Sequence, residues 1–260
     1  MNEQQQLPKV AVVIATHNNA QWLPGAIQSA ARQDYPNLMI YVIDDNSTDN
    51  TVELFIDHNQ YTNNHDLGEH LKIRSGHDMY GRELEFLSLK ENKGPSFARN
   101  IAIDHALANG CHVVAILDAD DQFLPGKISK CVAQILTDPQ TIAGVYADYV
   151  HANVQNGSIS YESKWTYDMM KLRQESIVHS GAVYNSLALR FLKENYGFYY
   201  VPDLTTCEDF ALNRMLAQRF LFVHIAEPLT LVRVHNNSSV NYRSKAEWEN
   251  NYRRAMSVQI

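Results

Sequence analysis

Short apolar runs alternate with helical segments through the first half of this chain. The runs are rich in aliphatic residues, and the run Val113–Leu117 is uninterrupted, as expected of a strand that is covered on both faces. They lie at Val10–Ala15, Leu38–Ile43, Leu84–Leu89 and Val113–Leu117. Helical segments follow at about 22–32, 50–58 and 96–108, and another begins near Pro125. This regular alternation predicts βαβ units with right-handed crossovers, and therefore an α/β fold with a mostly parallel central sheet flanked by helices.

The second half of the chain has a different pattern. Asn156-Gly157 lies between two short apolar runs and is a hairpin signal. We therefore expect a smaller mixed or antiparallel region after Val145. The segment 61–82 is polar and rich in Asn, His and Gly, which predicts an irregular excursion with a short strand at Leu71–Arg74.

Composition excludes several classes of protein. The net charge is −7 and the 22 Lys and Arg residues are dispersed, which argues against a dedicated nucleic-acid surface. The three cysteines lack the CxxC spacing of a zinc site and favour a reducing compartment. Met1–Gln6 is polar and unlike a signal peptide, and no apolar stretch approaches the roughly 20 residues that span a bilayer. A cytoplasmic location is expected.

Acidic side chains gather at the ends of two predicted strands. Asp118, Asp120 and Asp121 follow one strand, Asp44-Asp45 ends another, and Lys93-Gly94 follows a third. Neighbouring carboxylates repel one another unless a cation lies among them. Because open α/β sheets bind ligands beyond the carboxyl ends of their strands, these acids predict a metal-dependent phosphate or nucleotide site. The alternative is a solvated turn in which Asp118 caps the next helix.

Four segments, in order, resemble the pattern of family 2 glycosyltransferases of the GT-A fold. Val12–Asn18, Val42–Asp49, Asn92–Asn100 and Asp118–Asp121 are similar to that family's opening strand and loop, VVDDGSTD segment, NxGxxxARN element and DxD element, respectively. The opening segment departs from the family pattern, because Ala15 and His17 replace the usual Pro and Tyr. The resemblance covers nearly the whole chain and implies one Rossmann-like GT-A domain over residues 1–260.

The resemblance also implies roles for individual residues. The nucleotide-sugar pocket would be lined by Thr16, Asn18, Asp45, Lys93, Gly94, Arg99, Asp118 and Asp120. Asp45 would contact the base, Asp118 the ribose or donor sugar, and Asp120 a divalent metal that bridges the diphosphate. The structural alternatives are a helix cap for Asp45 and a helix-surface salt bridge for Arg99. Residues of about 7–145 would then hold the nucleotide sugar, and about 146–260 would form the acceptor side and a C-terminal helical tail.

Two later segments supply the remaining chemistry. Cys207–Phe210 resembles the family's ED element, so Asp209 is the expected catalytic base, with ordinary helix capping as the alternative. Arg233–Ser238 resembles the late segment in which a histidine completes the metal shell, here His235. Sugar transfer needs a cation on the leaving phosphates and a carboxylate to take the acceptor's proton. Oxygen ligands suit Mg²⁺ or Mn²⁺, and a histidine ligand favours Mn²⁺. Direct attack would invert the anomeric configuration.

The acceptor is expected in the second half of the chain. Glu208, Trp165 and His179 are its candidate residues, and nearby tyrosines either form a sugar platform or pack in the core. The family's processive synthases carry a QxxRW element that is missing here, which favours transfer of a single sugar. By family resemblance the donor is a UDP-sugar and the acceptor a glycan or lipid-linked saccharide. The basic C-terminal stretch is compatible with peripheral contact at the inner face of a membrane, or with a solvated helix face.

Three other readings compete with this one. A haloacid-dehalogenase-like phosphatase also carries an Asp-x-Asp pair, but on its first strand, which here ends in Ala15-Thr16-His17. A nucleotidyltransferase would need a Gly-rich first loop, which is missing. A catalytically silent relative that binds carbohydrate or nucleotide would not need Asp120 and Asp209, and both are present.

Overall fold

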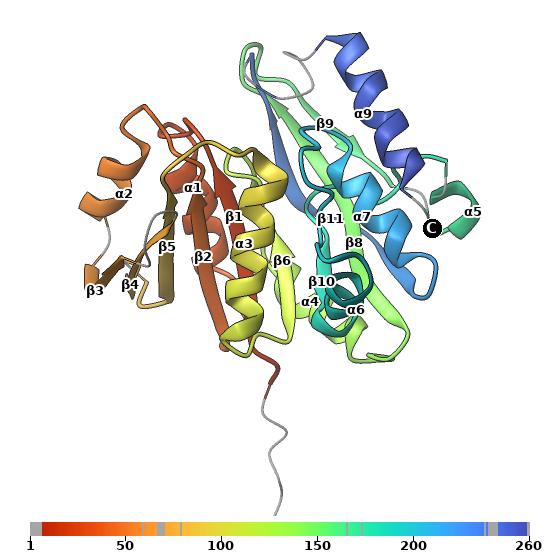
Figure 1. The fold of residues 1–260 in the computed structure, drawn as a ribbon, viewed down its shortest axis with the longest axis horizontal. Coiled ribbons are helices and arrows are strands. Elements are labelled where there is room, and N and C mark those ends of the chain that lie inside the picture. The colour runs from red at the N-terminus through yellow and green to blue at the C-terminus, as the bar shows by residue number, and fades with distance from the viewer. Residues whose placement is uncertain are drawn as a thin grey trace, which may run out of the picture.

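One mixed β-sheet runs through the molecule, with helices on both of its faces (Figure 1). The computed structural model describes residues 7–58, 60–66, 71–78, 80–164, 166–172, 174–236, 238 and 244–258, and of the stretch 56–71 it describes the backbone alone. The strands are β1 Val10–Thr16, β2 Leu38–Asp44, β3 Gln60–Asp66, β4 Leu71–His77, β5 Glu83–Leu89, β6 Val113–Ile116, β7 Gln122–Phe123, β8 Ile142–Asn153, β9 Ile159–Glu162, β10 Val183–Asn185 and β11 Leu221–Val234. The helices are α1 Leu23–Ala31, α2 Thr51–His58, α3 Pro95–Ala108, α4 Lys127–Ile135, α5 Met169–Leu172, α6 Ser186–Tyr196, α7 Glu208–Leu216 and α9 Lys245–Ser257.

The strand order is β3-β4-β5-β2-β1-β6-β10-β8-β11-β7, and β9 pairs with β8. Strands β5, β2, β1 and β6 are parallel to one another. Strand β10 is antiparallel to both β6 and β8, and β11 is parallel to β8. Strands β1, β2, β5, β6 and β11, which precede the candidate nucleotide-sugar and metal residues, therefore run in one direction, and β9, which precedes Trp165, runs the opposite way. The α/β fold class predicted from the alternation of strands and helices is confirmed.

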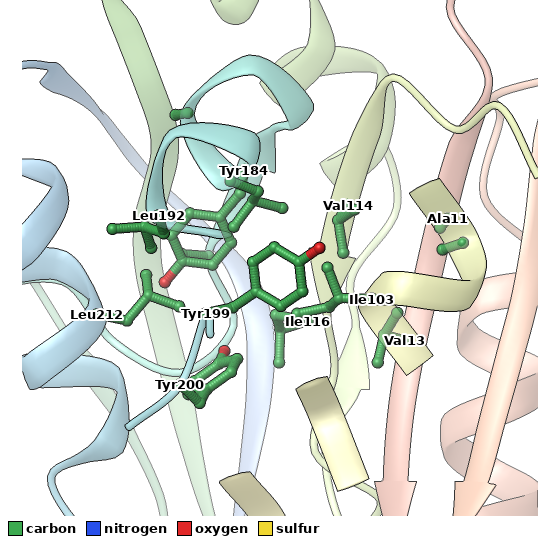
Figure 2. Close-up of a cluster of buried hydrophobic side chains, with 14 of the residues drawn as sticks. Ala11, Val13, Ile103, Val114, Ile116, Tyr184, Leu192, Tyr199, Tyr200 and Leu212 are labelled. Carbon is green, nitrogen blue, oxygen red and sulfur yellow. The ribbon is translucent and has the colours of Figure 1, made fainter. Parts of the chain in front are cut away.

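Successive residues of β1 pack on opposite faces of the sheet, as the pleat requires. Ala11 and Val13 belong to a core that also contains buried residues of α3, α6 and α7. Val12 and Ile14 belong to the core on the other face, with α1 and α4. Figure 2 shows part of the first core, in which Ile103 of α3 lies near Val114 and Ile116 of β6. Burial on both faces explains why these strands are continuous apolar runs.

The structure corrects one expectation and confirms two others. The irregular excursion predicted for 61–82 is wrong, because β3 and β4 form an antiparallel pair that extends the sheet beyond β5, but the short strand predicted at Leu71–Arg74 is confirmed as part of β4. Ile73 anchors β4 to the core, and the polar strand β3 is held at the outside of the sheet by backbone pairing with β4. The hairpin predicted at Asn156-Gly157 is confirmed as the connection between β8 and β9. Within the described ranges, no helix has the length and apolar composition needed to cross a bilayer.

Candidate active site

The candidate site begins where β1, β2 and α3 meet. The Asp45 backbone N–H donates to the Thr16 carbonyl at 2.8 Å. The Asp45 carboxylate accepts from the backbone N–H groups of Lys93 at 2.8 Å and Gly94 at 2.7 Å. Gly94 has φ +85°, which only glycine adopts without strain, and Pro95 then starts α3. Asp45 therefore joins the ends of two strands to the helix that carries Arg99.

The amide of Asn18 organises the loop after β2. Its Oδ1 accepts from the backbone N–H groups of Thr48 at 2.8 Å and Asp49 at 3.2 Å. Asn18 itself has φ +54°, a conformation that asparagine tolerates better than most residues. Asp44 is buried and accepts from the backbone and hydroxyl of Ser47, while burial raises the pKa of its carboxyl. The VVDDGSTD-like segment is thus held by hydrogen bonds with Asn18 and by its own bond between Asp44 and Ser47.

Thr16 and Lys93 present different groups to this pocket. Thr16 is buried, and its Oγ1 makes no hydrogen bond with any part of the chain that the structure describes. The Lys93 backbone faces Asp45, whereas its ammonium lies 3.2 Å from Glu91 and 5.6 Å from the centre of the Phe97 ring. With 38% of its side chain exposed, Lys93 lies at the rim of the site.

Arg99 connects α3 to the acids of β6 and α7. Its guanidinium donates to Asp118 Oδ1 at 2.7 Å and to Glu208 Oε1 at 2.8 Å, and lies over the Tyr200 ring. Burial alone would lower the pKa of Arg99, but the charges of Asp118, Asp209 and Glu208 hold it well above its usual value. One buried cation therefore holds together carboxylates that would otherwise repel one another.

We expect Arg99→Met to be strongly destabilising. The change keeps most of the side-chain volume but leaves three neighbouring acids without their cation, and breaking one partner of a buried ion pair costs about 3–5 kcal/mol. Urea unfolding at pH 7 measures this loss. At pH 5 the loss should be smaller, because the stranded carboxyls can then bind protons.

Arg219→Met is the matched control, because Arg219 is exposed and stacks on aromatic rings rather than on acids. It should change the free energy of unfolding by less than about 0.5 kcal/mol. An equal effect of the two substitutions would contradict the role given to Arg99.

The end of β11 is fastened to the acids that follow β6. His235 Nε2 lies 3.1 Å from Asp120 Oδ2, and its ring stacks on Trp22 with centroids 5.1 Å apart. Arg233 donates from Nη1 to the Asp120 carbonyl at 2.8 Å and from its backbone N–H to Asp121 Oδ1 at 2.9 Å. The late histidine and the DxD element, widely separated in the chain, are therefore neighbours in the structure.

Asp120 and His235 are the residues that fit a divalent cation. Burial, and then repulsion from Asp118, raises the pKa of the Asp120 carboxyl, so a nearby positive charge would be favourable there. In the described part of the chain, no three His, Cys, Asp or Glu side chains are grouped as a metal cage. Magnesium-type sites at phosphates commonly use one or two carboxylates and complete the shell with substrate oxygens. The donor set thus fits a cation that is held jointly with a diphosphate.

Asp209 lies in the first turn of α7, beside Glu208. Its Oδ1 is buried and makes no hydrogen bond with any described residue. Burial, followed by the charge of Glu208, raises the pKa of the Asp209 carboxyl to about 7. A carboxylate that is unpaired at one oxygen and titrates near neutrality has the properties of a general base.

The predicted acceptor residues lie in different surroundings. Glu208 uses its carboxylate to pair with Arg99. His179 Nδ1 accepts from the Gly181 backbone N–H at 2.9 Å, and its ring packs against Tyr149 with centroids 5.0 Å apart. Trp165 lies outside the described residues. Tyr199 and Tyr200 are buried beside Leu192 and Leu212 in the core, so they belong to packing rather than to a sugar platform (Figure 2).

Some residues of the site were not given a role from the sequence. Asn100 donates from Nδ2 to the Tyr200 carbonyl at 2.8 Å and accepts from the backbone N–H groups of Tyr199 and Tyr200. The ARN motif contained this residue without indicating its task. Trp22 and Arg233 support His235, and no feature of the sequence connected Trp22 to a histidine so far along the chain.

Comparison with known proteins identifies the family. The model of glycosyl transferase family 2 matches residues 11–197. The chain therefore belongs to glycosyl transferase family 2, a family of glycosyltransferases, and the phosphatase and nucleotidyltransferase readings are set aside. It is 24% identical over 244 residues to the putative teichuronic acid biosynthesis glycosyltransferase TuaG of Bacillus subtilis, covering 92% of this chain and 84% of TuaG. It is 26% identical to the succinoglycan biosynthesis protein ExoU of Rhizobium meliloti, covering 90% of this chain and 65% of ExoU.

Solved structures share the fold. S. aureus TarS 1-349 in complex with UDP-GlcNAc has a TM-score of 0.66 at 17% identity, over 95% of this chain and 65% of TarS 1-349. The mannosyltransferase PcManGT of Pyrobaculum calidifontis, in complex with GDP-Man and Mn²⁺, has a TM-score of 0.67 at 18% identity, over 98% of this chain and 66% of PcManGT. The chain spans only 16% of another relative, the Pasteurella multocida chondroitin synthase. These likenesses confirm the GT-A fold predicted from the sequence.

Proposed function

We propose that the chain is a metal-dependent inverting glycosyltransferase that moves one sugar from a nucleoside-diphosphate sugar to a hydroxyl of a glycan or lipid-linked acceptor. The observation that carries the proposal is the grouping at one sheet edge of Asp209, with a pKa of about 7, and the Asp120–His235 pair, linked through Arg99 and Asp118. Residues of about 7–145 form the donor half, and about 146–260 the acceptor half and the C-terminal helical tail.

The chain's own residues divide the reaction between them. The pocket at Thr16, Asp45 and Gly94 binds the nucleoside, because a buried hydroxyl and a glycine, which lets a ligand approach the backbone closely, lie beside a carboxylate there. Asp118 orients the donor sugar and is itself oriented by Arg99. Asp209 takes the proton from the attacking hydroxyl, which adds to the anomeric carbon as the diphosphate leaves from the opposite side. One direct displacement of this kind inverts the anomeric configuration.

Asp120 and His235 would hold the divalent cation. When bound, the cation neutralises the charge of the leaving diphosphate. Carboxylate oxygen suits Mg²⁺ and Mn²⁺, and the imidazole beside it favours Mn²⁺. The support from relatives is that PcManGT has been solved with GDP-Man and Mn²⁺.

The names of the relatives support the substrate classes. TuaG and ExoU are assigned to the biosynthesis of teichuronic acid and succinoglycan, and TarS has been solved with UDP-GlcNAc. We therefore propose a UDP-sugar as the first donor to test and a bacterial surface glycan, or its lipid-linked precursor, as the acceptor class. At the start of α9 the exposed Lys245 would suit an anionic headgroup beside such a precursor.

Donor hydrolysis tests the proposed function. UDP-, GDP- and dTDP-sugars are incubated with the protein and Mn²⁺, Mg²⁺ or EDTA, and the released nucleoside diphosphate is measured. We expect turnover of one donor that stops on chelation and returns with excess metal. Binding of all donors without turnover, unchanged by metal, would instead identify a catalytically silent binding protein.

A further inference from the structure

The loop that leads into α7 is held in an unusual conformation. Cys207, the residue before Glu208 and Asp209, has φ +60°, and Asp203 has φ +63°. Residues other than glycine persist in this region only where the surrounding structure fixes them. Cys207 also provides no side-chain cap for α7, so local capping does not place the helix start. The position of Asp209 must therefore be set by contacts from elsewhere in the molecule.

Two helices supply those contacts. Ser96, in the first turn of α3, donates to the Leu204 carbonyl at 2.6 Å. From the other side, Asn251 of α9 donates from Nδ2 to Thr205 Oγ1 at 3.2 Å and Thr206 Oγ1 at 2.9 Å. Asn251 is buried, with 4% of its surface exposed. The loop thus lies between a helix of the donor half and the last helix of the described chain.

Apolar packing holds α9 against α7 beside these bonds. Tyr252 stacks on Phe210, the residue after Asp209, with ring centroids 5.6 Å apart and planes 3° from parallel. Ala255 joins Leu204, Phe210 and Ala211 in a small buried cluster separate from the main cores. Arg214 of α7 donates to the Ala255 carbonyl at 2.6 Å. These contacts pack α9 against α7, and from this position Asn251 binds the loop.

We infer that Asn251 is a positioning residue for the catalytic base: it fixes Thr205 and Thr206, and through them the backbone turn that aims Asp209. The inference rests on the proposed function, because it concerns the residue assigned there as the base. It assigns a role to α9, which lies beyond the segment matched by the family model. Asn251 acts on the geometry of the base and does not contact substrate.

Asn251→Ala and Thr206→Val remove the two partners of one hydrogen bond. Either change should lower kcat about 10- to 100-fold, because a displacement of the order of 1 Å is sufficient for such a loss. The donor KM should stay within about twofold, because neither substituted residue lies in the donor pocket and the bond of Arg99 to Asp118 remains. The double variant should lose little more than Asn251→Ala alone, since that change already removes the bond to Thr206 together with the bond to Thr205. Additive losses would overturn the inference.

Two variants control for a merely structural effect. Thr206→Ser keeps the hydroxyl and should keep kcat. Tyr252→Phe removes a different bond from α9, that of its hydroxyl to the Gln174 carbonyl at 2.8 Å, and keeps the ring stack. A loss of kcat in Tyr252→Phe equal to that in Asn251→Ala would overturn the inference, because it would show that general loosening of α9 is the cause.

Amide hydrogen exchange separates this inference from the proposed function. In Asn251→Ala the amides of residues 204–211 should exchange at least about tenfold faster, while those of β1 and β6 keep their rates. This readout needs no substrate. Unchanged exchange at 204–211 would refute the role of Asn251 as a positioning residue, even in an active transferase. Faster exchange in a protein that turns over no donor would support that contact of Asn251 with the loop and refute the proposed function.

Discussion

Asp209→Asn is expected to abolish sugar transfer while leaving the donor bound. The amide keeps the size of the side chain but cannot accept the hydroxyl's proton, and loss of a general base costs about 10²–10⁴-fold in kcat. Donor affinity, measured by calorimetry with Mn²⁺ present, should stay within about threefold, because Asp209 lies on α7 rather than in the loops around Asp45. Equal losses of transfer and donor binding would assign Asp209 to structure.

The pH dependence provides a second check on Asp209. With a pKa of about 7, the carboxyl is protonated and inactive in acid, so kcat should rise through pH 7 and level off above it. Because the pKa of Asp209 is raised in the folded protein, ionisation of its carboxyl lowers the free energy of unfolding as pH increases. Asp209→Asn should therefore be no less stable than the wild type at pH 8. Asp203→Asn, an exposed change in the same loop, should leave kcat unchanged.

Asp120→Ala is expected to have the second largest effect. Removing the carboxylate leaves His235 as the remaining proposed metal ligand among the described residues. A bound cation stabilises the transition state by several kcal/mol, so its loss should lower kcat/KM by about 10³-fold or more. Titration of Mn²⁺ by electron paramagnetic resonance, with UDP present, should show weaker binding. Asp138→Ala removes an equal charge from an exposed turn and should change neither quantity.

Stability measurements distinguish a lost metal site from a damaged fold. Without metal, burial and then repulsion from Asp118 raise the pKa of the Asp120 carboxyl and oppose its ionisation. The Tm of metal-free Asp120→Ala should therefore be no lower than that of the metal-free wild type. A drop of several degrees would show that Asp120 supports the fold through its contact with His235.

The sequence predicted the first half of the fold well, because strands such as β1, β2 and β6 are buried on both faces and are continuous apolar runs. Predicted and observed strand bounds differ by about one residue at Val10–Thr16 and Val113–Ile116. Elements held mainly by backbone pairing were not predictable in the same way. Strand β7 is only Gln122–Phe123, and its existence depends on β11, far along the chain. Strand β3 likewise has no apolar alternation that could have indicated it, whereas its partner β4 contains the short strand predicted at Leu71–Arg74.

The candidate site was predictable where several acids end parallel strands, because topology brings such ends together. What the sequence could not show is which partner each side chain takes. The Lys93 ammonium pairs with Glu91, and the Asn18 amide oxygen accepts a hydrogen bond from the loop after β2. Arg99 was predicted as a pocket residue, but its hydrogen bond to Glu208 joins two residues that are far apart in the sequence. Contacts of that sequence separation follow from packing and leave no local pattern.

Strand β10 has a consequence for how enzymes of this design can diversify. It contributes just Val183–Asn185, yet it joins the four parallel strands of the donor half to the β8–β11 pair. Changes in β8, β11 or α9 that preserve this brief register leave the backbone pairing of β5, β2, β1 and β6 intact. The region around β8 and β9 can therefore change without disturbing the loops that carry Asn18, Asp45 and Lys93, whereas the end of β11 is constrained because Arg233 and His235 both contact Asp120.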